Sequence, residues 1–197
     1  MVDVNVEIRK IKKYAEENNV PIMLDDGIEF LLDYIKKFNV KKILEIGTAI
    51  GYSSIRMALL GNDIEVTTIE RDNDRYLEAI NNVKIFGLED RIHLIFNDAC
   101  NVNLDEKYDL IFIDAAKAQN IRFFEKFSYN LKETGTIITD NMLFHGLVES
   151  DDSLITSRNV RGLVRKIRAY KEFLINNERF DTEFLTIGDG IAISRFK

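Results

Sequence analysis

The chain contains few of the residues that cross-link or interrupt a protein. Cys100 is its only cysteine, so no disulfide can form within the chain and no cysteine cluster can hold zinc. Pro21 is its only proline, and no proline-rich or low-complexity linker divides the 197 residues. We therefore expect a single domain over residues 1–197 and a reducing, cytoplasmic location.

Long hydrophobic runs are also missing. No stretch approaches the roughly 18 apolar residues that a membrane span needs, and the first segment, MVDVNVEIRKIKKYAEENN, is amphipathic and unlike a signal peptide. We expect no membrane contact. Excess positive charge is absent too, because the formal net charge is −6. This balance disfavours indiscriminate adhesion to nucleic acid, but it is compatible with a local basic face.

The hydrophobic pattern alternates between helix and strand. Residues 4–18 and 26–38 place apolar side chains at spacings of three and four, which predicts two helices within residues 1–40. Short apolar runs then alternate with polar helical stretches, a pattern typical of a parallel sheet covered by helices on both faces. The runs that we expect to be strands are KKILEI, IEVTTIE, RIHLIF, YDLIFID, GTIITD, DTEFLTI and IAISRF. Gly-Asp-Gly joins the last two, which predicts a hairpin and one antiparallel strand. Residues 41–197 should form this doubly wound α/β core.

A glycine turn follows the first predicted strand, in LEIGTAIGYSS. Gly47 and Gly51 lie four residues apart, unlike the G-x-G-x-x-G of nicotinamide dinucleotide sites. Glu70 ends the second strand, twenty-three residues after Gly47, where an acidic residue commonly holds ribose hydroxyls. Asp98 follows the third strand and is a candidate for the adenine edge. Together they favour an adenosine-containing ligand over a purely structural turn.

Two later strands end in oxygen-bearing side chains. YDLIFID ends at Asp114, and GTIITD ends at Asp140, which Asn141 follows. If these strands are neighbours, two carboxylates and an amide converge on one point, a hard oxygen site suited to magnesium, manganese or calcium. The alternative is structural, with Asp114 as a helix cap and Asp140-Asn141 as a turn.

Taken together, these motifs resemble the cation-dependent S-adenosylmethionine O-methyltransferases of the catechol and caffeoyl-CoA type. The resemblance covers nearly the whole chain. Its motifs are NVPIM, LEIGTAIGYSSIRMA, TIERD, NDA, FIDAAKAQ, TDNMLFHGLV and GDGIAIS. Within the family the chain is most similar to the bacterial tRNA 5-hydroxyuridine methyltransferases, which make 5-methoxyuridine at the wobble position. The resemblance implies a class I, Rossmann-like methyltransferase fold with a carboxyl-terminal antiparallel strand, and a homodimer.

The resemblance also implies residue roles. The implied cofactor shell is Met23, Gly47, Ser53, Glu70, Asp98, Ala99 and Asp114. The implied ligands of Mg²⁺ or another divalent cation are Asp114, Asp140 and Asn141. Lys117 and Asp114 are the implied catalytic residues. A bound cation lowers the pKa of an acceptor hydroxyl and fixes its position, and Lys117 can accept the released proton or stabilise the oxyanion. The alternative for Lys117 is a solvated side chain at a helix start.

The placement of basic residues bears on the identity of the substrate. A long helix expected at about 157–176 carries one stripe of arginines, at spacings of three, four and three. These are Arg158, Arg161, Arg165 and Arg168. Such a stripe can follow the phosphates of a tRNA anticodon loop, although charged stripes are usually solvated faces. His145, in the loop after Asn141, is a candidate substrate contact.

Three functions remain open at this point. The first is a metal-dependent methyltransferase acting on 5-hydroxyuridine at the tRNA wobble position. The second is a small-molecule O-methyltransferase acting on catechol-like or caffeoyl-CoA-like acceptors, which needs the same cofactor and metal motifs. The third is a non-catalytic module that binds an adenosine ligand or RNA. It is disfavoured because a binding module needs no cation beside a sulfonium. The basic helix favours the first function.

Overall fold

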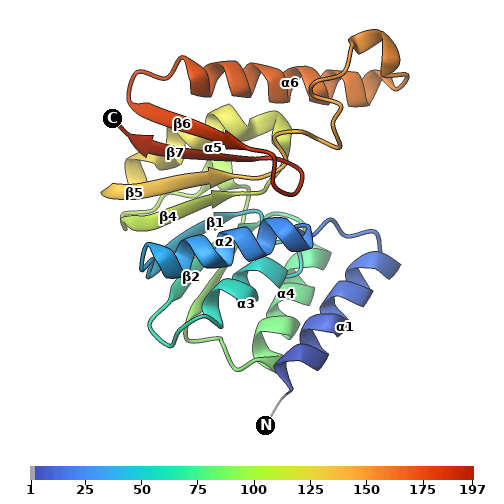
Figure 1. Cartoon of the computed structure of the whole chain (residues 1–197). Coiled ribbons are helices and arrows are strands. Elements are labelled where there is room, and N and C mark those ends of the chain that lie inside the picture. The colour runs from blue at the N-terminus through green and yellow to red at the C-terminus, as the bar shows by residue number, and fades with distance from the viewer. Residues whose placement is uncertain (1–2) are drawn as a thin grey trace.

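The computed structural model describes residues 3–197 as one mixed sheet with helices on both faces (Figure 1). The strands are β1 (Lys42–Ile46), β2 (Glu65–Glu70), β3 (Ile92–Phe96), β4 (Tyr108–Ile113), β5 (Leu131–Thr139), β6 (Phe180–Leu185) and β7 (Ile191–Phe196). The α-helices are α1 (Val4–Glu17), α2 (Asp25–Lys37), α3 (Tyr52–Ala58), α4 (Asn73–Ile85), α5 (Asn120–Phe127) and α6 (Arg158–Ile175). The expected α/β class and the alternation of helix and strand are confirmed.

The strand order is β3-β2-β1-β4-β5-β7-β6. Pairing is parallel throughout, except that β7 runs antiparallel to both β5 and β6, as the Gly-Asp-Gly hairpin predicts. The chain builds outward from β1 to β3, then returns to the other side of β1 with β4. The strand order therefore reverses between β1 and β4. In open sheets of this type, ligands bind at this reversal, outside the carboxyl ends of the strands.

Two apolar clusters hold the helices on the sheet. On one face, the helices α1, α2, α3 and α4 share a cluster with strand side chains such as Ile43 and Phe112. On the other face, α5 and α6 pack on side chains such as Ile111 and Ile137. Right-handed crossovers explain this division, because connections that run in opposite directions from the centre lie on opposite faces. Figure 1 shows α6 beside β6, at the end of the sheet away from β2.

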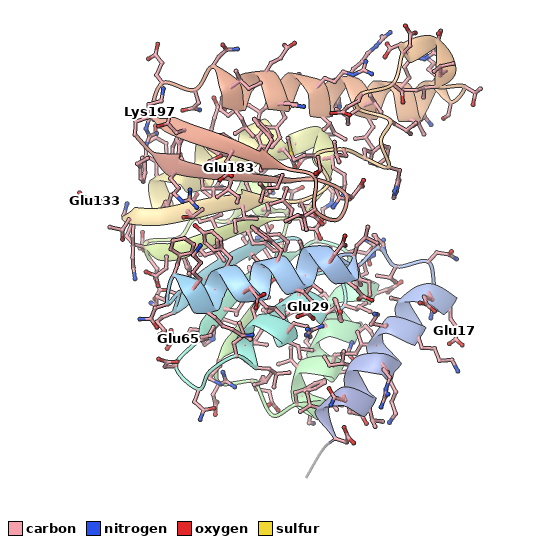
Figure 2. The ribbon with its side chains drawn as sticks, viewed as in Figure 1. Glu17, Glu29, Glu65, Glu133, Glu183 and Lys197 are labelled. Atoms are coloured by element: carbon pink, nitrogen blue, oxygen red, sulfur yellow. The ribbon has the colours of Figure 1, made fainter. Side chains whose placement is uncertain are left out.

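The helices begin where the sequence supplies caps. Asp3 accepts hydrogen bonds from two backbone N–H groups at the start of α1, and Ser157 accepts one from Val160 at the start of α6. Charged side chains such as Glu17, Glu65 and Glu133 lie on the outside of the fold (Figure 2). Within residues 3–197, none of the helices combines the length and the apolar character that a bilayer crossing requires.

Candidate active site

The register of the central strands brings the predicted site residues into one row. Ile46 of β1 pairs with Ile113 of β4, and Ile113 pairs with Thr139 of β5. The residues one step further, Asp114 and Asp140, therefore lie side by side at the carboxyl edge. Their backbone N–H groups still donate to the adjacent strands, at 3.0 Å to the Ile46 carbonyl and 3.2 Å to the Ile113 carbonyl.

The glycine turn begins in the same row. Gly47 has a φ of +101°, and a Cβ there would lie 2.5 Å from the backbone oxygen of Asp114. Only glycine permits both the left-handed backbone and this close approach. The N–H groups of Gly47 and Thr48 donate to the Ile69 carbonyl at 3.0 and 3.3 Å, which ties the turn to β2.

A cavity of about 380 Å³ opens above this row. The predicted residues that line it are Gly47, Glu70, Asp98, Ala99, Asp114, Lys117 and Asn141. Met23, Ser53 and Asp140, also predicted as site residues, are not among the residues that line it. Met23 is buried against Gly27 of α2, and the Ser53 hydroxyl donates to Glu45 at 2.5 Å. Among the residues that the sequence reasoning missed are Arg71, Gln119 and Leu163, which reach the cavity from three separate segments.

Backbone amides fix the two acidic side chains that the sequence predicts to contact adenosine. Glu70 accepts hydrogen bonds from the N–H groups of Ala49 at 2.9 Å and of Arg71 and Asp72 at 2.8 Å each. Asp98 accepts from the Cys100 N–H at 2.8 Å, and this bond holds the pKa of the Asp98 carboxyl below its usual value. Both side chains are therefore preorganised acceptors, as a ribose and an adenine amino group require.

Glu45 lies beneath the glycine turn, completely buried. The hydroxyls of Ser53, Ser54 and Thr68 all donate to its carboxylate. Burial raises the pKa of Glu45 to about 7, although the three hydroxyls act in the opposite direction. Glu45 thus connects α3, β1 and β2 through one carboxylate.

Asp114, Asp140 and Asn141 form the candidate cation site. The Asn141 side-chain nitrogen lies 3.2 Å from Oδ1 of Asp114, and rotation of the amide would present its oxygen instead. Burial raises the pKa of Asp114 to about 6, and Lys117 opposes this effect. Burial and then Asp114 raise the pKa of Asp140 to about 7. Two carboxylates in this position are difficult to ionise together without a cation.

One atom of this group supports the fit of a cation. Oδ1 of Asp140 is buried and has no hydrogen-bond partner among the described residues. Such an oxygen is costly to leave unpaired, and a divalent cation supplies the missing partner. Within residues 3–197, no three His, Cys, Asp or Glu side chains gather in a metal-binding group. A cation here would therefore depend on the Asn141 amide as the third protein ligand.

Lys117 lies in a short 3₁₀ turn that packs against α6. Its Nζ is 3.8 Å from Oδ1 of Asp114, and both side chains are 19% exposed. Lys117 therefore places a positive charge at the cavity wall, within one side-chain length of the candidate cation site.

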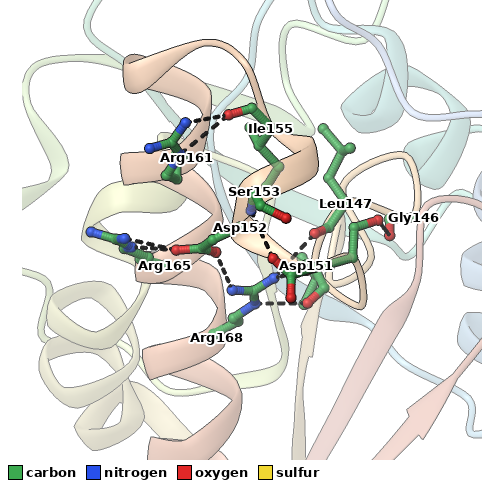
Figure 3. Close-up of polar contacts among 11 residues, drawn as sticks. Gly146, Leu147, Asp151, Asp152, Ser153, Ile155, Arg161, Arg165 and Arg168 are labelled. Carbon is green, nitrogen blue, oxygen red and sulfur yellow. Dashed lines mark hydrogen bonds and ion pairs between the residues drawn. The ribbon is translucent and has the colours of Figure 1, made fainter.

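The predicted arginine stripe is largely engaged within the chain (Figure 3). Arg161 donates to the Ile155 carbonyl at 2.6 Å through Nη2. Arg165 and Arg168 both donate to Asp152, and Arg168 also donates to the Val148 carbonyl at 2.8 Å. These contacts fasten the loop between β5 and α6 onto α6. The sequence reasoning missed Asp152 because it lies just outside the basic segment.

The turn between β6 and β7 also holds the loop that follows Asn141. Asp189 is buried, its backbone carbonyl accepts from the Leu143 N–H at 2.7 Å, and its side chain accepts from the His145 N–H at 2.5 Å. The His145 ring is exposed, with Nδ1 3.9 Å from the Asp189 carboxylate. His145 is not among the residues that line the cavity, so a substrate contact there stays a prediction.

Comparisons with known proteins identify the family of this chain. The model of a protein family described as O-methyltransferase matches residues 3–197. The chain belongs to this family. Caffeoyl-CoA O-methyltransferase of Populus kitakamiensis is 30% identical over 193 residues, covering 93% of this chain and 81% of that protein. The predicted enzyme class, an S-adenosylmethionine-dependent O-methyltransferase, is confirmed.

Solved structures of the family superpose over nearly the whole chain. A Staphylococcus aureus protein provisionally assigned as a caffeoyl-CoA O-methyltransferase is 45% identical, with a TM-score of 0.91 over 96% of this chain and 92% of that one. A Bacillus cereus O-methyltransferase in complex with SAH is 25% identical, with a TM-score of 0.82 over 100% of this chain and 93% of that one. The class I methyltransferase fold expected from the sequence is confirmed.

Proposed function

We propose that this O-methyltransferase uses a divalent cation to methylate the hydroxyl of 5-hydroxyuridine at the wobble position of tRNA. The observation that carries the cation requirement is the buried Oδ1 of Asp140, beside Asp114 and Asn141, which has no hydrogen-bond partner within residues 3–197. A transferase that needed no cation would gain nothing from two adjacent carboxylates whose burial penalises their charge.

S-adenosylmethionine fits the adenosine end of the cavity. Glu70 accepts hydrogen bonds from the ribose hydroxyls, and Asp98 accepts one from the adenine amino group. Backbone amides already hold both carboxylates in place for these contacts. The Gly47 turn leaves room for the ligand to approach the backbone. The Bacillus cereus relative is a complex with SAH, which supports S-adenosylmethionine as the cofactor.

The residues around Asp114 stabilise the charge of the acceptor oxygen and hold it in position. When bound by Asp114, Asp140 and Asn141, the cation supplies positive charge that favours the ionised acceptor oxygen. The Lys117 ammonium stabilises the same oxyanion from the cavity wall. Methyl transfer is an in-line displacement, so holding that oxygen in line with the methyl group supplies most of the remaining catalysis.

5-Hydroxyuracil carries its hydroxyl next to the O4 carbonyl, so it offers adjacent oxygens as a catechol does. Both acceptor classes therefore suit the same cation site. Two features favour RNA: the resemblance of NVPIM and FIDAAKAQ to the tRNA branch, and the arginine stripe of α6, in which the Arg165 side chain is 65% exposed. The Populus relative favours the second candidate, a catechol-like or caffeoyl-CoA-like acceptor.

A methyl-transfer assay separates the candidates. Labelled S-adenosylmethionine and Mg²⁺ are offered with tRNA carrying 5-hydroxyuridine, with the same tRNA lacking the hydroxyl, and with a simple catechol or caffeoyl-CoA. We expect label only in the hydroxylated tRNA. Label in the small molecules alone would assign the enzyme to the second candidate and refute the tRNA proposal.

A further inference from the structure

The turn between β6 and β7 contacts the segment that directly follows the candidate cation site. The Met142 N–H donates to the Gly190 carbonyl at 2.9 Å, and the Leu143 N–H donates to the Asp189 carbonyl at 2.7 Å. The His145 N–H donates to Oδ1 of the Asp189 side chain at 2.5 Å. Two residues of one turn therefore hold three of the first four backbone N–H groups after the site.

The same segment has a backbone that its residues do not favour. Asn141, Phe144 and His145 have φ angles of +65°, +46° and +56°, in the left-handed region. Asparagine tolerates this region, but a bulky side chain such as that of Phe144 is a poor fit. Such a conformation persists only where the surrounding structure holds it. The segment therefore depends on the contacts that the turn supplies.

The turn and the segment pack closely. Gly190 has a φ of +86°, and a Cβ there would lie 2.6 Å from Cγ of Leu143 and 2.8 Å from the Leu143 nitrogen. The interface has no room for even one added methyl group. Asp189, the neighbour of Gly190, is 7% exposed, so its carboxylate acts from inside the protein. A shift of the turn would move the segment with it.

This contact reaches the cation site through Asn141, which lies between two anchored neighbours. On one side, the Asp140 N–H donates to a carbonyl of β4 at 3.2 Å, and on the other side Gly190 holds Met142. Asn141 itself lines the cavity, with its side-chain nitrogen 3.2 Å from Oδ1 of Asp114. The position of its amide therefore depends on both anchors.

We propose that Asp189 is a positioning residue for the cation site. By accepting the His145 N–H, its carboxylate holds residues 142–145 and so places the Asn141 amide for the cation. The inference rests on the divalent cation of the proposed function. A ligand that is already held in place costs less free energy to order when the cation binds. Residues that hold a metal ligand from behind commonly change metal affinity by about 10–100-fold when they are lost.

The affinity for Mn²⁺ tests this role without turnover. The readout is the dissociation constant of Mn²⁺, measured by electron paramagnetic resonance in the presence of S-adenosylhomocysteine. Asp189→Ala removes the acceptor, and we expect Mn²⁺ to bind about tenfold more weakly. The Mg²⁺ concentration for half-maximal methyl transfer should rise by a similar factor, while the rate at saturating Mg²⁺ stays near that of wild type. Equal Mn²⁺ affinity in Asp189→Ala and wild type would overturn the inference.

Asp189→Asn separates position from charge. After burial and Asp114, the Asp189 carboxylate is the third cause that raises the pKa of Asp140, so its charge also acts on the site. Asparagine loses this charge but keeps an oxygen that can accept the His145 N–H. We expect Asp189→Asn to recover most of the Mn²⁺ affinity that Asp189→Ala loses. Equally weak binding by the two variants would assign the effect to charge and contradict the positioning role.

Asp26→Ala is the matched control. The Asp26 side chain accepts from the Gly188 N–H at 3.1 Å and from the Gly27 N–H at 3.0 Å, so it holds the same turn from α2. This variant loses one carboxylate and one hydrogen bond to the turn, as Asp189→Ala does, but leaves the His145 N–H its acceptor. We expect wild-type Mn²⁺ affinity. A loss as large as that of Asp189→Ala would show that any loosening of the turn suffices.

Two further comparisons separate the possible failures. Wild-type protein that binds no Mn²⁺ and methylates its acceptor after chelation refutes the proposed cation, and the inference with it. Wild-type protein that binds Mn²⁺ no better than Asp189→Ala refutes the positioning role alone. Thermal unfolding and S-adenosylhomocysteine binding check that each variant is folded. Asp189→Leu, which keeps the branched shape without an acceptor, replaces an Asp189→Ala protein that is not.

Discussion

Glu45 illustrates how one buried carboxyl can make the stability of the fold depend on pH. It is fully buried and receives three hydroxyl donors, yet burial still raises its pKa to about 7. Charging this carboxyl therefore costs free energy in the folded state that it does not cost in the unfolded chain. The stability that depends on neutral Glu45 is present at low pH and is lost as the pH rises through about 7.

Glu45→Gln should remove this pH dependence. Glutamine keeps the shape of the side chain but cannot ionise. The melting temperature of Glu45→Gln minus that of wild type should therefore increase between about pH 5 and pH 8. Thermal unfolding of both proteins across this range measures the difference. Glu65→Gln, at an exposed position of β2, is the control and should show no such trend. A constant difference between wild type and Glu45→Gln would contradict the raised pKa.

The convergence of Asp114 and Asp140 could be predicted from the sequence, because each directly follows an apolar run and parallel strands share one carboxyl edge. The pairing of Asp152 with Arg165 could not. The two residues are thirteen positions apart, and the irregular segment that precedes α6 has no periodicity from which their contact could be read. Ser53 was expected in the cofactor shell, but its hydroxyl donates to Glu45 and Ser53 is not among the residues that line the cavity. Its contact with cofactor stays a prediction.

At the scale of elements, the site depends on how β1 ends. The strand passes into Gly47 against the backbone of Asp114, so a single turn controls both the cofactor wall and the spacing of β1 from β4. Gly87, after α4, has a φ of +63°, but a Cβ there would meet nothing within 4 Å. The two glycines therefore share a left-handed backbone and differ in their surroundings.

Gly47→Ala should destabilise the protein by more than the roughly 1–2 kcal/mol that a left-handed backbone costs an alanine. The added methyl group clashes with the Asp114 carbonyl oxygen, so binding of S-adenosylhomocysteine should also weaken strongly. Gly87→Ala should show the backbone cost alone and normal binding. Unfolding curves and calorimetric titration make the comparison. Similar behaviour of the two variants would refute the close approach as the reason for Gly47.

The bounds of most elements could be predicted, since apolar periodicity is a local property. The helix expected at about 157–176 is Arg158–Ile175, and the first two helices agree to within a residue. The placement of β7 between β5 and β6 could not be derived from periodicity, because pairing between distant strands depends on their fit in the assembled core. The same holds for the loop after Asn141, whose support comes from Asp189.

At the scale of the whole molecule, charge is arranged more finely than its total indicates. The formal net charge is −6, and Asp152 pairs with two of the four arginines in the basic stripe of α6. A stripe read from sequence therefore overstates the positive charge that is free to meet RNA. The homodimer expected from the resemblance stays a prediction.

The measurement that tests the account most directly is methyl transfer by wild-type and Asp140→Ala proteins, after chelation and again after Mg²⁺ is restored. We predict that Mg²⁺ restores the wild-type rate. In Asp140→Ala, we predict a loss of about 100-fold or more at every Mg²⁺ concentration, because the charge on the acceptor oxygen is no longer offset. S-adenosylhomocysteine should bind both proteins alike. Unchanged turnover in chelated wild type, or in Asp140→Ala, would contradict a cation held by Asp114, Asp140 and Asn141.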